Sequence, residues 1–296
     1  MMEQQTKYLC KGCFKMIFEH EIPDGSRLYF GNIAKKKRVL ENKIATFLEN
    51  KNFDEIVTPN FSYSQHQSID DENQLIKISD SENNQVSLRA DSTLDVARII
   101  TRRLGRTTSH KKWFYIQPVF SYPSNENYQI GLEWLEYDNA SDMINLTSEV
   151  LDLIGIKPLI QVTNINIPKL VAEELALDLE IFKNGEVSKL FDLKITWLNK
   201  LLYATTNDDL RDVVSILPSN VKVEVEKLIS IVEAITYKNT TVSPLYYTPM
   251  KYYDDVYYRV IEGNLTLAKG GRYKSEGVSS LGFALYTDNL LKILED

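Results

Sequence analysis

Two strongly β-prone runs, residues 113–122 and 128–138, flank the polar segment Pro123-Ser-Asn-Glu-Asn127. Aromatic and β-branched residues favour strands, and proline, serine and asparagine favour a turn between them. The sequence therefore predicts an antiparallel hairpin with one apolar face. That face needs a covering layer, so the hairpin restricts the chain to folds in which helices pack on an antiparallel sheet.

Shorter patterns extend this α+β architecture. A helix is expected after Ser92, because apolar residues recur there at helical spacing. Other helices are expected at 32–51, 167–177, 221–235 and from 286 onward, and other strands at 53–59, 75–79, 85–89, 159–163, 251–261 and 265–268. We expect a tail at 1–15 and one core domain at 16–296, with a mostly helical insertion at about 140–240.

The bulk properties exclude several classes of function. The net charge is -7 and the chain lacks the overall basic footprint of nucleic-acid binders. Cys10 and Cys13 form a single C-x-x-C without the second ligand pair of a zinc site, and Met16 is an alternative start that would remove both. No apolar stretch is long enough for a signal peptide or a membrane span. We expect a cytoplasmic protein without metal or cofactor.

Strand alternation sets out the first candidate site. Gln129, Gly131 and Glu133 share one face of the second strand, since residues i and i+2 point the same way. The missing side chain at Gly131 would leave room for a small polar cation against the backbone. The alternative is a solvent-exposed face with a packing glycine.

A second alternation places Arg89, Asp91 and Thr93 at a strand end leading into a helix. Asp91 and Glu133 together would suit an ammonium group, because charge-assisted hydrogen bonds are strong. The alternative for Asp91 and Ser92 is helix capping alone.

Two further segments could contribute. Lys269-Gly-Gly-Arg-Tyr273 has paired glycines that would let the backbone approach a ligand, although Gly-Gly also favours a simple turn. Tyr252 and Tyr253 lie in a tyrosine-rich run, which an amphipathic strand with rings on both faces would equally explain.

In chain order, these segments resemble the motifs of class II histidyl-tRNA synthetase over about residues 17–296. Asp91, in the place of that family's glutamate, is more typical of a paralogue family, the regulatory subunit of ATP phosphoribosyltransferase. The resembling segments are Pro23-Asp-Gly25 with 38–59, Leu88-Arg-Ala-Asp-Ser-Thr93, 115–133 ending in Q-x-G-x-E, Gly270-Gly-Arg-Tyr273 and Leu281-Gly-Phe-Ala284.

Three departures separate the two families. Ser121, Thr248 and Asn289 stand where the resemblance would place arginines that contact ATP and the reacting carboxylate. Loss of even one comparable donor costs about 10²–10³ in rate, so no catalytic residue is expected. The chain ends after the third motif's helix, so no anticodon-binding domain is expected either.

The resemblance implies a non-catalytic regulatory subunit that senses histidine. It implies a homodimer, assembled with a catalytic ATP phosphoribosyltransferase subunit, with no nucleic acid or membrane as partner. Two alternatives stay open: a truncated synthetase-like enzyme that adenylates an amino acid, and a synthetase paralogue serving another assembly. The implied histidine-binding residues are Asp91, Thr93, Gln129, Glu133, Tyr253, Gly270, Gly271, Arg272 and Tyr273.

Overall fold

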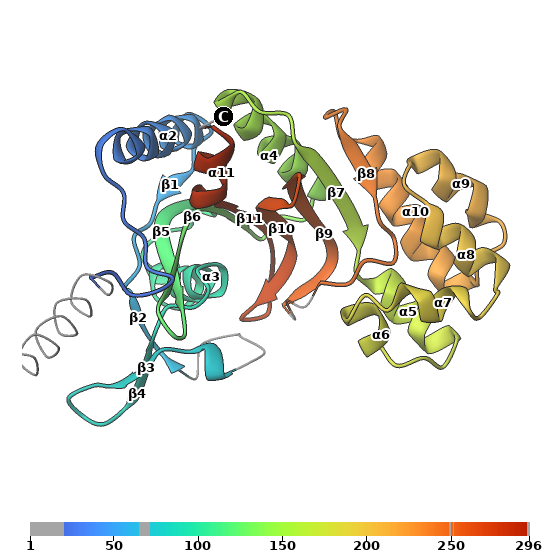
Figure 1. Ribbon diagram of the computed structural model, residues 1–296, viewed down its shortest axis with the longest axis horizontal. Helices are drawn as coiled ribbons and strands as arrows, with labels where there is room; N and C mark the ends of the chain where they lie inside the picture. The colour runs from blue at the N-terminus through green and yellow to red at the C-terminus, as the bar shows by residue number, and fades with distance from the viewer. Residues whose placement is uncertain (1–20, 65–71, 249, 251, 295–296) are drawn as a thin grey trace, which may run out of the picture.

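The computed structural model describes residues 21–64, 72–248, 250 and 252–294, so the predicted tail with Cys10 and Cys13, and also Met16, lie outside the described residues. A strongly curved sheet runs through the middle of the molecule, and a helical lobe extends beyond one edge of it (Figure 1). The sheet has eight strands in the order β1-β5-β6-β11-β10-β9-β7-β8. The pairs β1–β5 and β7–β8 are parallel and the others antiparallel. The expected α+β class is confirmed.

The predicted hairpin is present as β5 and β6, but its turn is shorter than expected. Ser121 pairs with Asn125, so β6 begins within the segment predicted as turn. Strand β11 was not expected, and β1 is limited to two residues at the sheet edge. The strands are β1 Asp54–Glu55, β5 Lys112–Ser121, β6 Asn125–Leu135, β7 Leu159–Asn164, β8 Thr240–Val242, β9 Tyr253–Glu262, β10 Leu265–Ser275 and β11 Val278–Tyr286.

Three helices cover one face of this sheet: α2 (Gly31–Asn50), α4 (Ala140–Ile154) and α11 (Thr287–Ile293). The predicted apolar stripe of α2 is buried, as Leu40, Ile44 and Leu48 show. Ile130 and Leu132 of β6 belong to the same core cluster, so the apolar face of the hairpin has the helix layer that it was expected to need.

The opposite face of the sheet carries α3 (Thr93–Arg102) and a small second sheet. That sheet has the order β2-β4-β3, with β2 Phe61–Tyr63, β3 Lys77–Ser79 and β4 Gln85–Leu88, and short 3-10 turns lie at Glu72–Gln74 and Leu104–Arg106. Arg89, which follows β4, is fully buried. Its guanidinium donates to the carbonyls of Thr58, Pro59 and Pro118, so it joins the second sheet to β5.

The inserted lobe is narrower than the predicted 140–240. Helix α4 belongs to the layer on the main sheet, while β7 and β8 are strands of that sheet. The lobe itself consists of α5 Asn166–Glu174, α6 Glu180–Lys183, α7 Val187–Phe191, α8 Thr196–Tyr203, α9 Asn207–Val214 and α10 Ser219–Glu233. In the part of the chain that the structure describes, no helix combines the length and the apolar character that a membrane span requires.

Candidate functional site

A buried carboxylate, Glu133, lies at the centre of the sheet face that α3 covers. Its side chain has no exposed surface, and the Tyr115 hydroxyl donates to Oε1 at 3.5 Å. Oε2 has no hydrogen-bond partner among the described residues. Burial raises the pKa of Glu133 to about 8, while the nearby hydroxyls of Tyr273 and Thr93 act in the opposite direction. A buried acceptor without a partner is costly, so this oxygen points to a polar ligand.

Gly282 makes the position of this carboxylate possible. It pairs with Glu133 across strands β11 and β6. A Cβ at residue 282 would lie 2.0 Å from Oε2 of Glu133 and 2.6 Å from the carbonyl oxygen of Leu132. Any side chain at 282 would therefore displace the carboxylate.

The space above Gly131 differs from the expectation. A Cβ at residue 131 would lie 2.0 Å from Cζ of Tyr115, so the tyrosine ring occupies the gap that the sequence predicted for a ligand. Gly131 and Tyr115 are paired across β6 and β5, and that register places the ring directly over the glycine. The glycine thus positions an aromatic wall and a hydroxyl that reaches Glu133.

The N-terminus of α3 brings a second carboxylate to this face. Asp91 Oδ1 accepts from the backbone N–H of Leu94 at 3.2 Å, and Oδ2 accepts from the Tyr252 hydroxyl at 3.2 Å. Burial raises the pKa of Asp91. The capping interpretation thus holds for one carboxylate oxygen of Asp91, but the other accepts from Tyr252.

The two residues that follow Asp91, Ser92 and Thr93, each direct a hydroxyl to a neighbouring strand. Ser92 does not cap the helix, because its hydroxyl accepts from the side-chain amide of Gln117. The hydroxyls of Thr93 and Tyr115 lie 3.5 Å apart, which links Asp91's helix to the Glu133 side of the site.

A layer of tyrosine rings forms the third wall of the site. Tyr253, Tyr257 and Tyr273 are all buried. The ring centroids of Tyr252 and Tyr253 are 4.6 Å apart, and those of Tyr253 and Tyr257 are 5.0 Å apart. The hydroxyls of Tyr257 and Tyr273 have no hydrogen-bond partner among the described residues. This wall combines flat apolar surface with polar groups that are free to contact a ligand.

Strand β10 divides the predicted Gly270-Gly-Arg-Tyr273 set between the two faces of the sheet. Tyr273 and Gly271 contact the tyrosine layer, since a Cβ at 271 would lie 3.0 Å from the Tyr253 ring. Gly270 packs against Tyr258, whose hydroxyl bonds to Thr147 of α4 on the helix-covered face.

Arg272 also points to the helix-covered face. It donates to the carbonyl of Asp138 and pairs with Asp255 at 3.4 Å. The structure therefore does not bring Gly270 and Arg272 to the face that carries Glu133, because the segment is an extended strand and not a turn. Asp91, Thr93, Glu133, Tyr253, Gly271 and Tyr273 do converge.

Gln129 lies at the margin of the site. It pairs with Gln117 and with Tyr286 and is partly buried. Lys269 of β10 alternates with Gly271 and Tyr273, and its Nζ lies 5.9 Å from the Tyr286 ring centroid. Burial lowers the pKa of Lys269. Tyr115 is a residue of the site that the sequence analysis did not single out.

The three positions expected to have lost arginines hold small side chains with structural contacts. Asn289 donates from Nδ2 to the carbonyl of Thr266 at 2.8 Å. Thr248 is buried and accepts from the N–H of Met250. Ser121 ends β5, where its carbonyl accepts from Asn125.

Two carboxylates ringed by hydroxyls and aromatic rings form a site that can hold an ammonium group beside a flat side chain. Within the described ranges, no three His, Cys, Asp or Glu residues come together in a way that could hold a metal ion. The arrangement supports recognition of a small polar molecule.

Comparisons with known proteins show which family the chain resembles. The sequence model of the histidyl-tRNA synthetase family matches residues 31–290. A Wolinella succinogenes protein named ATP phosphoribosyltransferase regulatory subunit is 44% identical over 277 residues, covering 94% of this chain and 96% of that protein. A Helicobacter hepaticus protein of the same name is 40% identical over 280 residues, covering 94% and 99%.

Solved structures share the fold. A Bacillus halodurans protein described as an ATP phosphoribosyltransferase regulatory subunit/histidyl-tRNA synthetase superimposes with a TM-score of 0.83 at 19% identity, covering 94% of this chain and 84% of that one. A histidyl-tRNA synthetase from Nostoc superimposes with a TM-score of 0.75 at 16% identity, covering 93% and 75%. These neighbours confirm the predicted class II synthetase-like core and, at such identities, bear on the fold alone.

Proposed function

We propose, from the premise that this chain belongs to the family of ATP phosphoribosyltransferase regulatory subunits, that it serves the first step of histidine biosynthesis as a non-catalytic subunit. Its partner would be a catalytic ATP phosphoribosyltransferase subunit in the cytoplasm. The relatives in that family match nearly the whole chain at 44% and 40% identity.

The observation that carries a regulatory role for histidine is the unpartnered oxygen of Glu133 beside Asp91. An α-ammonium group would supply the missing donor, and its charge would favour ionisation of both carboxyls. Tyr253, Tyr273 and Gly271 would border the imidazole, with Thr93 beside the ammonium and Gln129 at the margin. Binding would shift the arrangement of the catalytic subunits, with a coupling of about 1–3 kcal/mol.

The absence of catalysis is part of the proposal. Ser121, Thr248 and Asn289 have neither the charge nor the reach to hold ATP phosphates. The Thr248 hydroxyl accepts from the backbone N–H of Met250, and the Asn289 amide donates to the backbone carbonyl of Thr266. The pocket would hold an amino acid that does not react there.

Calorimetry and activity measurements test the proposal together. Purified chain is mixed with the catalytic subunit of the same organism, with and without histidine. We expect association, higher phosphoribosyltransferase activity in the complex, and inhibition by histidine that Glu133→Gln weakens. Absence of association, or a complex whose activity ignores histidine, would contradict the proposal.

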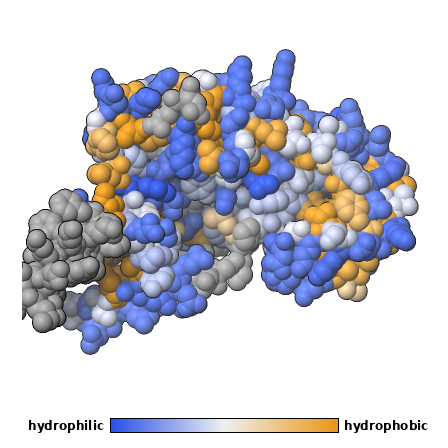
Figure 2. All heavy atoms as spheres, in the orientation of Figure 1, coloured by the Kyte–Doolittle hydropathy of each residue, from blue (hydrophilic) through white to orange (hydrophobic). Residues whose placement is uncertain are grey.

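A homodimer through α2 and β1 is also proposed, because large apolar side chains lie exposed there. Phe30 is 75% exposed, Val39 57% and Val57 77%. Figure 2 shows apolar patches on the surface over α2. Light scattering would give twice the chain mass for the wild type, and Val57→Glu should yield monomers. A monomeric wild type would refute the dimer.

A further inference from the structure

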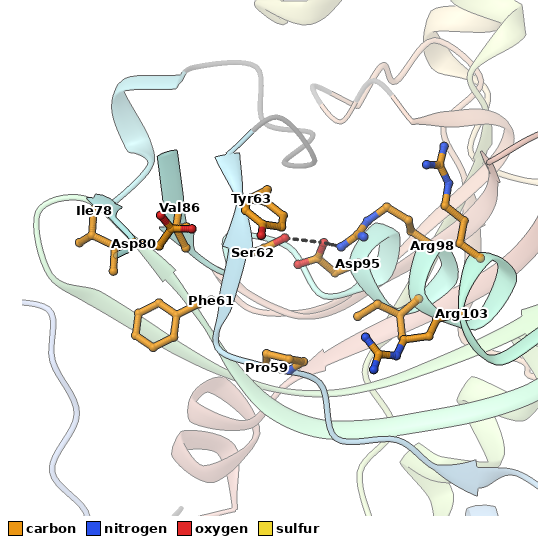
Figure 3. Close-up of a pocket in the computed structure, with 12 residues that line it drawn as sticks. Pro59, Phe61, Ser62, Tyr63, Ile78, Asp80, Val86, Asp95, Arg98 and Arg103 are labelled. Atoms are coloured by element: carbon orange, nitrogen blue, oxygen red, sulfur yellow. Dashed lines mark hydrogen bonds and ion pairs between the residues drawn. The ribbon is translucent and has the colours of Figure 1, made fainter. Parts of the chain in front are cut away.

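A groove of about 560 Å³ runs along both sides of strand β2 (Figure 3). On one side it is lined by α3 and Arg103, and on the other by the outer face of the small second sheet. Its size falls within the range of binding cavities in proteins. None of the groups discussed so far as ligand contacts lines it.

The sheet wall of this groove exposes large apolar side chains. Phe61 of β2 is 56% exposed and Ile78 of β3 is 44% exposed. Ser62 is buried on the other side of β2, where its hydroxyl points toward α3 and donates to Asp95 at 3.1 Å. Alternation along β2 therefore turns Phe61 outward, where no packing within the described residues accounts for it.

The helix wall carries a cluster of arginines in a chain whose net charge is -7. Arg98 pairs with Asp95 at 2.9 Å, and Arg102 pairs with Glu276 although its side chain is 63% exposed. Arg103 is exposed, and its side chain has no ion pair or hydrogen bond among the described residues. Figure 3 shows Arg98 and Arg103 extending from α3, with Phe61, Ile78 and Val86 beyond β2.

The helix dipole explains part of this cluster but not the groove. Cations at a helix C-terminus are favourable, so one arginine at the end of α3 needs no ligand. Exposed Phe61 and Ile78 gain nothing from that effect. Arginine and aromatic side chains together are the residue types that protein interfaces favour, and a fully exposed arginine pairs best with a partner's carboxylate.

We propose that this groove docks an acidic segment of the catalytic subunit, with an apolar side chain of that segment seated against Phe61 and Ile78. The inference rests on the proposed function and adds the surface where the two proteins meet. Aspartate or glutamate of the segment would pair with Arg103 and Arg102.

Two other occupants fit less well. A small anion such as inorganic phosphate would leave the exposed Phe61 and Ile78 uncovered. A second copy of the chain, joined through this groove by a two-fold axis, would bring the arginines of both copies together. An acidic segment with an apolar side chain brings no second set of arginines and also covers the apolar side chains.

The same helix joins the groove to the tyrosine-lined site. Asp91 and Thr93 lie at the start of α3, and Arg102 lies at its end, about 15 Å away at 1.5 Å per residue. A partner held at one end and a ligand held at the other would act on one rigid element. Their affinities would then be coupled reciprocally.

Binding of the purified catalytic subunit to single variants tests the docking surface. Arg103→Glu and Phe61→Ser should each weaken the association about tenfold or more, as central interface residues do. Matched controls are Lys200→Glu and Ile216→Ser, which are exposed on the helical lobe and should leave the dissociation constant unchanged. Higher salt should slow association of the wild type more than that of Arg103→Glu.

The outcomes separate the two proposals. If the wild type does not bind the catalytic subunit, the proposed function fails. If the wild type binds and both groove variants bind equally well, only the docking proposal fails. Loss of the homodimer in Arg103→Glu, or Arg103-dependent binding of inorganic phosphate with unchanged association, would also overturn it. Unchanged thermal unfolding of the variants excludes misfolding as the cause.

Discussion

Gly282 of β11 leaves open the space that the Glu133 carboxylate of β6 occupies, since a Cβ there would approach Oε2 to 2.0 Å. The two residues are direct partners in the sheet. The ligand-facing carboxylate is thus positioned by the absence of a side chain on the next strand.

Replacing Gly282 with alanine should displace Glu133 and weaken histidine binding at least tenfold, because the methyl group and the carboxylate oxygen cannot share the site. Crowding of this kind costs about 1–3 kcal/mol of stability, so the variant should still fold. Calorimetric titration with histidine measures the effect. Ser279→Ala on the same strand is the control and should bind as the wild type does. Equal affinities for Gly282→Ala and wild type would disprove the positioning role.

Histidine binding should release a proton from Glu133. The pKa of this group is about 8 in the free protein, so it is mostly protonated at pH 7. A bound ammonium favours the carboxylate, and the proton leaves. Affinity should therefore rise with pH up to about 8. Calorimetry at pH 7 in phosphate and in Tris buffer measures the release, because a released proton makes the binding enthalpy depend on the buffer. The Glu133→Gln variant is the control for protons exchanged by the imidazole of histidine. Identical enthalpies in the two buffers would rule it out.

The same group should make the free energy of unfolding depend on pH. Its pKa is raised from 4.5 in the unfolded chain to about 8 in the folded one. Between these values the folded state holds a proton that the unfolded state has lost, so this contribution to stability decreases as pH rises. The slope is at most about 1.4 kcal/mol per pH unit. Urea unfolding of Glu133→Gln should show a stability, relative to wild type, that increases from pH 5 to pH 8. A difference that stays constant over that range would argue against the raised pKa.

Arg89 should contribute strongly to stability although it touches no proposed ligand. Arg89→Met would leave the buried carbonyls of Thr58, Pro59 and Pro118 without donors. We expect a loss of about 3–5 kcal/mol in the free energy of unfolding, the range for breaking a buried charged network. Exposed Arg106→Met should change it by no more than about 0.5 kcal/mol. Similar urea midpoints for the two variants would contradict this role.

Amino-acid activation should be undetectable. With ATP, histidine and labelled pyrophosphate, the chain should show no exchange above background, because Ser121, Thr248 and Asn289 supply no cation to developing negative charge. A histidyl-tRNA synthetase is the positive control. Exchange at a comparable rate would mean that the chain is an adenylating enzyme.

The hairpin and the two carboxylates could be predicted because strand alternation is a local property. The face on which Glu133 and Asp91 each lie follows from the alternation of residues within their own segments. The ring above Gly131 could not be predicted, because it depends on register. A turn spanning 123–127 pairs Gly131 with Val119, whereas the tighter turn that pairs Ser121 with Asn125 places Tyr115 there.

Arg272 shows a second limit of sequence reasoning. The paired glycines were expected either to let the backbone approach a ligand or to form a simple turn, but both lie inside β10 between two neighbouring strands. Only those neighbours require an extended backbone and send Arg272 away from Tyr273. Tertiary context decided the conformation here, against the local preference of glycine.

Adjacent residues of strand β10 therefore have two separate roles, one on each face of the sheet. Tyr273 faces the proposed ligand site, and Arg272 ties the strand to Asp255 and to the chain entering α4. An engineer who wants a different ligand should leave this strand alone and vary Tyr252 and Tyr253, because a change in β10 alters recognition and the attachment of the helix layer at once. Because Arg272 fixes β10 to Asp255 and to the chain before α4, a small shift of Tyr273 on binding of the proposed ligand would move β10 and these attached segments together.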